Sequence, residues 1–189
     1  MGSKMLFNQK KEFNQKNGKE DGKMKIRMSR YYGDGSVTKS VMRIESERGG
    51  FEPMECEARE MAFKVYTEKF RGSSGYCVPE GTYTMQPRCT EFGVMTLRTK
   101  DMRGHANVSI GWSWTRQTKH DTILVGWSDG SQAAEVRRIT GSRECFDELT
   151  KRVYAAWADG EEFTLEIVNE DPLCPDGHLP HNGETMRNV

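Results

Sequence analysis

The stretch "SRECFDELTKRVYAAWADGEEFTLEIV" (residues 142–168) contains the change in periodicity that decides the fold class. In its first part apolar side chains recur at three- and four-residue spacing: Phe146, Leu149, Val153 and Trp157. This spacing places them on one face of an amphipathic helix over residues 142–158, where we expect them to pack against a core. In the last part apolar and polar residues alternate, which predicts a strand over residues 163–167.

Residues suited to helix ends lie at both limits of the predicted helix. The hydroxyl of Ser142 is of the type that caps a helix, accepting a hydrogen bond from a backbone amide of the first turn. Gly160 follows the last turn and suits the left-handed conformation that ends many helices. We therefore expect Ser142 to be the N-cap and Gly160 the residue after the C-cap.

Short strands are predicted in front of the helix. Residues 25–32 and 36–45 flank a Gly-Asp-Gly turn, with alternation at Ile26, Met28 and Arg30, then at Val37 and Val41. Further strand candidates follow at residues 54–60, 82–85, 93–99, 106–112 and 122–127. We predict an α+β fold: a mostly antiparallel sheet or small barrel of about seven to eight strands, with one helix before the last strand.

The ends of the chain differ in composition from its middle. Residues 1–23 are rich in Lys, Asn, Gln, Gly and Glu and lack apolar periodicity, which predicts a disordered polar and basic arm. A nucleic-acid-binding arm is the alternative interpretation of its charge. Residues 170–189 are polar with three prolines and are expected to form a flexible tail. A single domain is predicted over residues 24–169.

Composition excludes some classes of protein. The chain has 28 basic and 28 acidic residues, so it has no net positive charge that would attract a polyanion. No run of about 18 apolar residues exists that would span a membrane, and no apolar segment at the N-terminus predicts a signal peptide. Five cysteines without a C-x-x-C pair favour reduced thiols and a cytoplasmic location.

Cysteine and histidine patterns give little support for a catalytic or metal site. Cys77 and Cys89 flank a predicted strand, and we interpret them as small apolar packing residues in preference to nucleophiles. Cys174, His178 and His181 are of ligand types that bind zinc, but a fourth ligand is missing and the segment belongs to the predicted tail. Phosphate-loop, dinucleotide and zinc-protease motifs are absent from the sequence. We therefore predict neither a metal nor a cofactor.

The segment 109–127, "SIGWSWTRQTKHDTILVGW", contains the candidate functional residues. His120, Asp121 and Thr122 resemble a catalytic triad in composition, but adjacent residues of a strand point to opposite faces and do not converge. We interpret residues 118–121 as a turn, which leaves His120 and Thr122 as weak catalytic candidates. Trp112 and Trp114 share a face of an extended chain, and paired indoles stack on sugars, bases or partner side chains; the alternative is that they pack in the core.

Four residues are therefore predicted to form a binding surface: Trp112, Trp114, Arg116 and His120. This interpretation does not require a catalytic role for His120, Asp121 or Thr122.

The order of short motifs resembles a bacterial and phage family, the domain-of-unknown-function family numbered 5675. Residues 56–60 are similar to its "C-x-x-L-E-D" segment, and residues 78–83, "VPEGTY", to its "I-P-x-G-x-Y". The central "G-C-I-L-V-G" of the family falls on residues 121–126, and its closing helix and strand fall on residues 142–158 and 163–167. The resemblance covers residues 24–169.

This resemblance implies a scaffold related to L,D-transpeptidases, in which a cysteine attacks a cell-wall peptide. Carried over residue by residue, the family's histidine falls on Gly111 and its Gly-Cys on Asp121 and Thr122. The chain departs from the family at each of these positions, so we expect a non-catalytic binding or structural protein of phage, prophage or bacterial type. A peptidoglycan-derived peptide or another phage or bacterial protein is the implied partner, and association with a virion or prophage is implied with it.

Two alternatives remain open from the sequence. One is a residual cell-wall peptide hydrolase or transpeptidase that uses His120 and Thr122, or a thiol of Cys77 or Cys89. The other is a nucleic-acid accessory protein that uses the basic arm and the tryptophans of residues 112–114. Nucleic acid is the less favoured partner because the charge of the whole chain is balanced.

Overall fold

The computed structural model describes residues 22–33, 36–48, 50–61, 77–89, 94–99, 108–114 and 121–170. The predicted arm and tail lie outside these ranges apart from residues 22, 23 and 170. Within the ranges that are described, none of the helical segments combines the length and the apolar character needed to cross a membrane.

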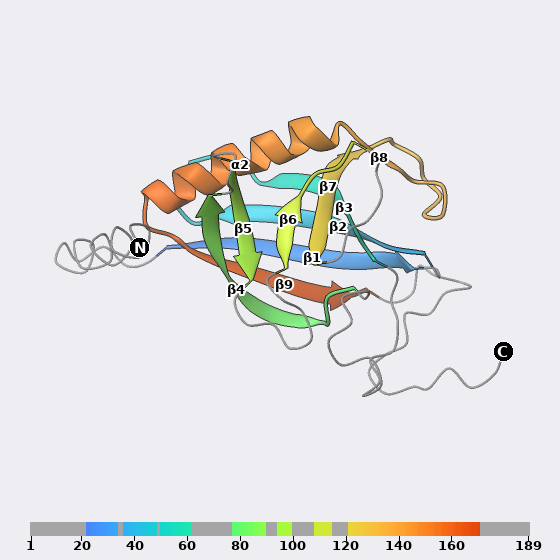
Figure 1. Cartoon of the computed structure of the whole chain (residues 1–189), viewed down its shortest axis with the longest axis horizontal. Coiled ribbons are helices and arrows are strands. Elements are labelled where there is room, and N and C mark those ends of the chain that lie inside the picture. Colours follow the sequence, from blue (N-terminus) through green and yellow to red (C-terminus); the bar gives the residue numbers. More distant parts are fainter. Residues whose placement is uncertain are drawn as a thin grey trace.

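The strands form a closed barrel (Figure 1). Hydrogen-bonded neighbours follow the order β3-β2-β1-β9-β4-β5-β6-β7-β8, and an additional β3–β7 pairing closes a ring of eight strands. The strands are β1 Lys23–Gly33, β2 Val37–Ser46, β3 Met54–Met61, β4 Gly81–Cys89, β5 Met95–Thr99, β6 Ser109–Gly111, β7 Thr122–Ser128, β8 Ile139–Thr140 and β9 Glu162–Asn169. This result confirms the predicted α+β class and selects the barrel over the open sheet.

Most neighbouring strands in the barrel are antiparallel. Two pairs, β1 with β9 and β6 with β7, are parallel. The ring closes where β3 runs antiparallel to β7, with Ala58 opposite Val125. A closed barrel of about eight strands leaves no long unpaired edge, and its interior is just wide enough for side chains to fill.

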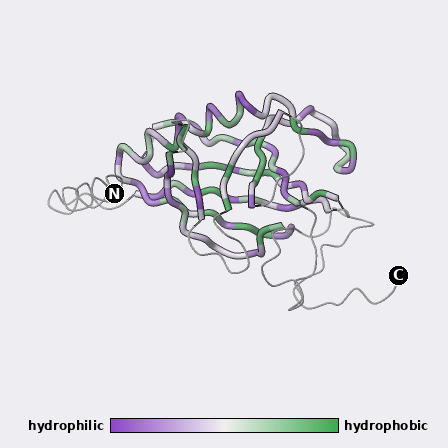
Figure 2. Tube along the Cα trace, in the orientation of Figure 1, coloured by the Kyte–Doolittle hydropathy of each residue, from purple (hydrophilic) through white to green (hydrophobic). Residues whose placement is uncertain are grey.

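The barrel interior is apolar over most of its length, and hydropathy alternates along the strands (Figure 2). On β2 the two valines do not lie on the face that points into the barrel. Val37 and Val41 are half-buried, whereas the buried residues of the other face are Thr38, Ser40, Met42 and Ile44. Pairing explains this choice, since Met42 lies between Met28 of β1 and Cys56 of β3 in the register.

The helix α2 (Ser142–Ala158) runs along the upper side of the strands in Figure 1. The buried side chains of α2 belong to the same core cluster as the barrel interior: Cys145, Phe146, Leu149, Val153 and Ala156. Trp157, at the end of the predicted stripe, is only partly buried at the margin of this core. The helix therefore uses its apolar face as predicted from its periodicity.

The two ends of α2 differ in how well they were predicted. Gly160 has a φ of 79° and donates to Trp157 O, while the amide of Glu161 donates to Ala156 O. This is the expected glycine-based helix end. The N-cap, in contrast, is Gly141 with a φ of 50° and not Ser142, which is the first helical residue. The prediction for Ser142 was wrong because its hydroxyl bonds to a neighbouring strand instead.

One end of the barrel contains a buried ion pair. Arg30 and Glu60 are both fully buried, with Arg30 Nη2 at 2.9 Å from Glu60 Oε2. Glu60 Oε1 also accepts a hydrogen bond from Val78 N at 2.8 Å, and Arg30 Nη2 donates to Val78 O. We call these three residues the Arg30–Glu60 clamp. It ties the segment before β4 to the interior of the barrel.

Candidate binding site

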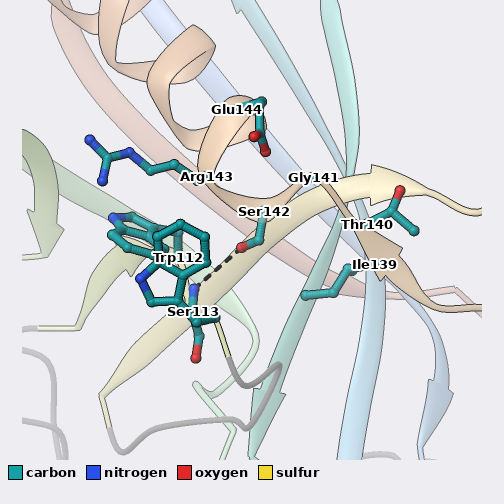
Figure 3. A pocket seen from close by; sticks show the side chains of 9 residues that line it. Trp112, Ser113, Ile139, Thr140, Gly141, Ser142, Arg143 and Glu144 are labelled. Atoms are coloured by element: carbon teal, nitrogen blue, oxygen red, sulfur yellow. Dashed lines mark hydrogen bonds between the residues drawn. The ribbon is translucent and has the colours of Figure 1, made fainter.

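A pocket of about 230 Å³ lies where the chain leaving β6 meets the start of α2 (Figure 3). Its wall is formed by two segments that are distant in sequence. The lining residues are Trp112, Ser113, Trp114, Ile139, Thr140, Gly141, Ser142, Arg143 and Glu144. We refer to it as the tryptophan pocket. Two of the four predicted binding residues, Trp112 and Trp114, therefore lie together in one pocket.

Ser142 holds the two segments of the pocket together. Its hydroxyl donates to Val125 O at 2.6 Å and accepts from Ser113 N at 3.3 Å (Figure 3). A single side chain thus links the helix, strand β7 and the segment that carries both indoles. The short side chain of serine suits this place, because the hydroxyl must reach both backbone groups from the first helical residue.

The two indoles of the pocket have different surroundings. Their ring centroids lie 4.9 Å apart with an interplanar angle of 86°, which is an edge-to-face arrangement. Trp112 is partly buried and packs against the core, whereas Trp114 is 79% exposed. The alternative that both tryptophans pack in the core therefore holds for Trp112 and does not hold for Trp114.

Arg143 adds a positive charge beside the indoles. Its Cζ lies 4.8 Å from the centroid of the Trp112 ring, within the range of a cation–π contact. Its Nε lies 3.0 Å from both carboxylate oxygens of Asp147, one turn later in the helix. The guanidinium is therefore oriented by a carboxylate on one side and an aromatic ring on the other.

The His-Asp-Thr sequence is only partly within the described ranges. His120 lies outside them, as does Arg116, so the structure does not place either predicted residue. Asp121 has a φ of 53°, and its carbonyl accepts a hydrogen bond from Ser109 N at 2.9 Å. Asp121 is therefore a turn residue at the start of β7, while residues 118–120 of the predicted turn lie outside the described ranges.

Gly111 and Thr122 lie side by side in the barrel wall. The parallel strands β6 and β7 pair Ser109 with Thr122 and Gly111 with Leu124. A Cβ atom built on Gly111 would lie 3.1 Å from Thr122 Cγ2. Side chains at these two positions therefore point toward the same space. These are the positions to which the family resemblance carries the histidine and the cysteine.

Two of the buried thiols, Cys56 and Cys77, have a raised pKa. Burial raises the pKa of Cys77 to about 12, in spite of the nearby Arg30 guanidinium. The pKa of Cys56 is also raised, by a hydrogen bond with Cys145 and by burial. Cys89 is exposed at the end of β4. Because the thiolate is the nucleophilic form, Cys77 is poorly suited to catalysis.

The residues that the structure describes contain no cluster of three or more His, Cys, Asp and Glu side chains that would hold a metal ion. Cys174, His178 and His181, which have ligand-like spacing, lie outside the described ranges.

Sequence reasoning missed the helix side of the pocket. Ser142 and Arg143 were assigned only to the start of the predicted helix and Gly141 to no element, although all three line the pocket. The turn preference of Gly141 and the hydroxyl of Ser142 are visible in the sequence. Their contact with residues 112–114 depends on strand pairing and has no local signal.

Comparison with known proteins does not assign this chain to a family. Neither the scan against family models nor the searches of curated proteins and of solved structures found a match.

Proposed function

We propose that this protein is a non-catalytic binding domain, of phage, prophage or bacterial origin, whose ligand site is the tryptophan pocket. The observation that carries the proposal is the exposure of Trp114, which is 79% exposed although it lies beside a pocket. Exposed tryptophan is unusual on a protein surface, and aromatic residues are enriched where proteins bind their partners. Its backbone is tied to the barrel through Ser113 and Ser142.

The geometry at Gly111, Asp121 and Thr122 supports a scaffold of the L,D-transpeptidase type that has lost its catalytic groups. In the resembling family a Gly-Cys sequence occupies residues 121–122, and Asp121 here adopts the positive φ that glycine favours. Gly111, at the histidine position, faces Thr122 at the cysteine position. Glycine has no base, and a threonine hydroxyl without a base is a poor nucleophile. We therefore expect binding without acyl transfer.

A cell-wall muropeptide is the ligand that this scaffold favours. The experiment is a titration of the whole protein with purified disaccharide-peptide muropeptides, followed by intrinsic tryptophan fluorescence. We expect saturable quenching that Trp114→Ala abolishes. The matched control is Tyr154→Ala, which removes an exposed aromatic residue from α2 outside the pocket. Quenching that is unchanged in Trp114→Ala, or absent in the native protein, would overturn the proposal.

The scaffold part of the proposal has a separate test. Gly111→His combined with Thr122→Cys would place an imidazole beside a thiol, which lowers the pKa of the thiol and speeds its alkylation. We expect this double variant, in a Cys89→Ser background, to react faster with iodoacetamide at neutral pH than Thr122→Cys alone. Peptide mapping by mass spectrometry identifies the labelled cysteine. Equal rates of alkylation at residue 122 in both variants would refute the interpretation that Gly111 and Thr122 occupy the positions of a lost histidine and cysteine.

A further inference from the structure

The shape of the tryptophan pocket restricts which ring can bind in it. Trp112 and Trp114 are nearly perpendicular, at 86°, so they form a corner and not a slot between parallel faces. A planar base that intercalates needs two parallel faces, and this pair does not offer them. Trp114, which is 79% exposed, instead offers its own ring to a ligand. A ring that stacks with a single face satisfies this geometry.

The charges beside the pocket also restrict the ligand. Arg143 pairs with the carboxylate of Asp147, and a second carboxylate, that of Glu144, also lines the pocket. Binding of a nucleic acid relies on a basic groove that neutralises several phosphates. One arginine already paired with a carboxylate does not provide such a groove. Among the lining residues that the structure describes, the charges therefore favour an uncharged polar ligand over a polyanion.

A sugar ring fits both restrictions. The electron-rich face of an indole attracts the weakly positive C–H groups of a sugar. Sugar hydroxyls donate as well as accept hydrogen bonds, so they suit a pocket that is lined by a carboxylate, Glu144, and by a guanidinium, Arg143. An apolar peptide side chain in this place would remove water from these charged groups without replacing their hydrogen bonds.

From these observations, and on the basis of the function proposed above, we infer that the pocket binds a saccharide stacked on Trp114. Of the two halves of a muropeptide, the glycan half is the one recognised. Glu144 and Arg143 bond to its hydroxyls beside the stacked ring.

The test separates the two halves of the same ligand. Amidase cleavage of a purified muropeptide yields a peptide-free disaccharide and a free stem peptide, and both are titrated against the whole protein by isothermal calorimetry. A single-stranded oligonucleotide at low salt is the third probe. We expect the disaccharide to bind with most of the affinity of the intact muropeptide, and the peptide and oligonucleotide not to bind.

Substitutions at Trp114 show whether the aromatic face is responsible. Trp114→Leu keeps an apolar side chain without an aromatic face and should weaken disaccharide binding about tenfold or more. Trp114→Phe keeps a smaller aromatic face and should weaken it less. Tyr154→Ala serves as the control that should leave binding unchanged, and circular dichroism checks that each variant folds.

The outcomes distinguish this inference from the proposed function. If the free peptide or the oligonucleotide binds in a Trp114-dependent manner and the disaccharide does not, the pocket is a binding site but the saccharide inference is wrong. Equal binding of the disaccharide to Trp114→Leu and to native protein would also overturn it. If neither the intact muropeptide nor its fragments bind, both proposals fail.

Discussion

Two arginine–carboxylate pairs, one inside the barrel and one beside the tryptophan pocket, show how the same chemistry acts in two environments. In the Arg30–Glu60 clamp both side chains are 0% exposed, and their polar atoms are directed at each other and at Val78. In the pair Arg143–Asp147 the side chains are 41% and 46% exposed, and the guanidinium also lies over Trp112.

The difference separates structural residues from candidate ligand-binding residues. Burial makes an unpaired charge costly, so the buried pair must remain intact for the barrel to fold around it. An exposed pair contributes little to stability, because water screens it and replaces lost hydrogen bonds. We therefore expect substitutions at the clamp to change the free energy of unfolding and substitutions at the pocket to change ligand binding.

The largest effect should come from breaking the clamp on one side. Glu60→Ala leaves the Arg30 guanidinium buried without its carboxylate and should lower the free energy of unfolding by about 3–5 kcal/mol, measured by urea denaturation. The control is Arg30→Met with Glu60→Leu, which removes both charges and should cost much less. A double variant as unstable as Glu60→Ala would contradict this account.

A decline in stability at alkaline pH should come next. Burial raises the pKa of Cys77 to about 12, and burial together with the hydrogen bond to Glu57 raises that of Tyr31. Unfolded Cys and Tyr lose their protons near pH 8.5 and 10, roughly, so above these values the unfolded state binds fewer protons than the folded state. The free energy of unfolding should therefore fall as pH rises, by about 1.4 kcal/mol per pH unit for each group.

Urea denaturation at pH values from 7 to about 11 measures this decline. The variant Cys77→Ala with Tyr31→Phe removes two of the groups with a raised pKa and should make the decline less steep, while Cys56 and Tyr83, whose pKa values are also raised, keep their contributions. A native protein whose stability stays constant over this range would show that these groups are not protected in solution.

A smaller effect is expected for Ser142, which links the two segments of the tryptophan pocket. Ser142→Ala removes the hydrogen bonds to Val125 O and from Ser113 N and should lower the free energy of unfolding by about 1 kcal/mol. It should also weaken muropeptide binding, because the backbone before Trp114 loses its attachment to α2. The control for both measurements is Ser128→Ala, which removes one exposed local hydrogen bond from Gly130 N at the end of β7 and does not touch the pocket lining. Binding that survives unchanged would argue that Ser142 does not position the indole.

The smallest effect on stability should come from Trp114. Its side chain is 79% exposed, so Trp114→Ala should change the free energy of unfolding by less than about 0.5 kcal/mol. Trp112→Ala, which removes a side chain packed on the core, should cost more. Thermal unfolding of the two variants makes the comparison. A larger loss for Trp114 would assign it a structural role and weaken the binding proposal.

Sequence alone determined the elements that depend on local periodicity. The apolar spacing in α2 and the alternation in β9 each arise within one segment, and Gly160 ends the helix through its own backbone preference. These features were predictable because helix and strand periods act on neighbouring residues. The paired tryptophans were recognised for the same reason, since residues two apart share a face of an extended chain.

Tertiary structure alone decided how these elements combine. Pairing of Ala58 with Val125 closes the barrel, and the register of β2 turns Thr38 and Ser40 inward instead of the valines. The short strand β8, which was not predicted, pairs with β7 and leads into Gly141. Strand register and the meeting of residues 112–114 with 139–144 depend on contacts between distant segments. The sequence therefore revealed the indoles, while the folded chain determined which one is exposed and what surrounds it.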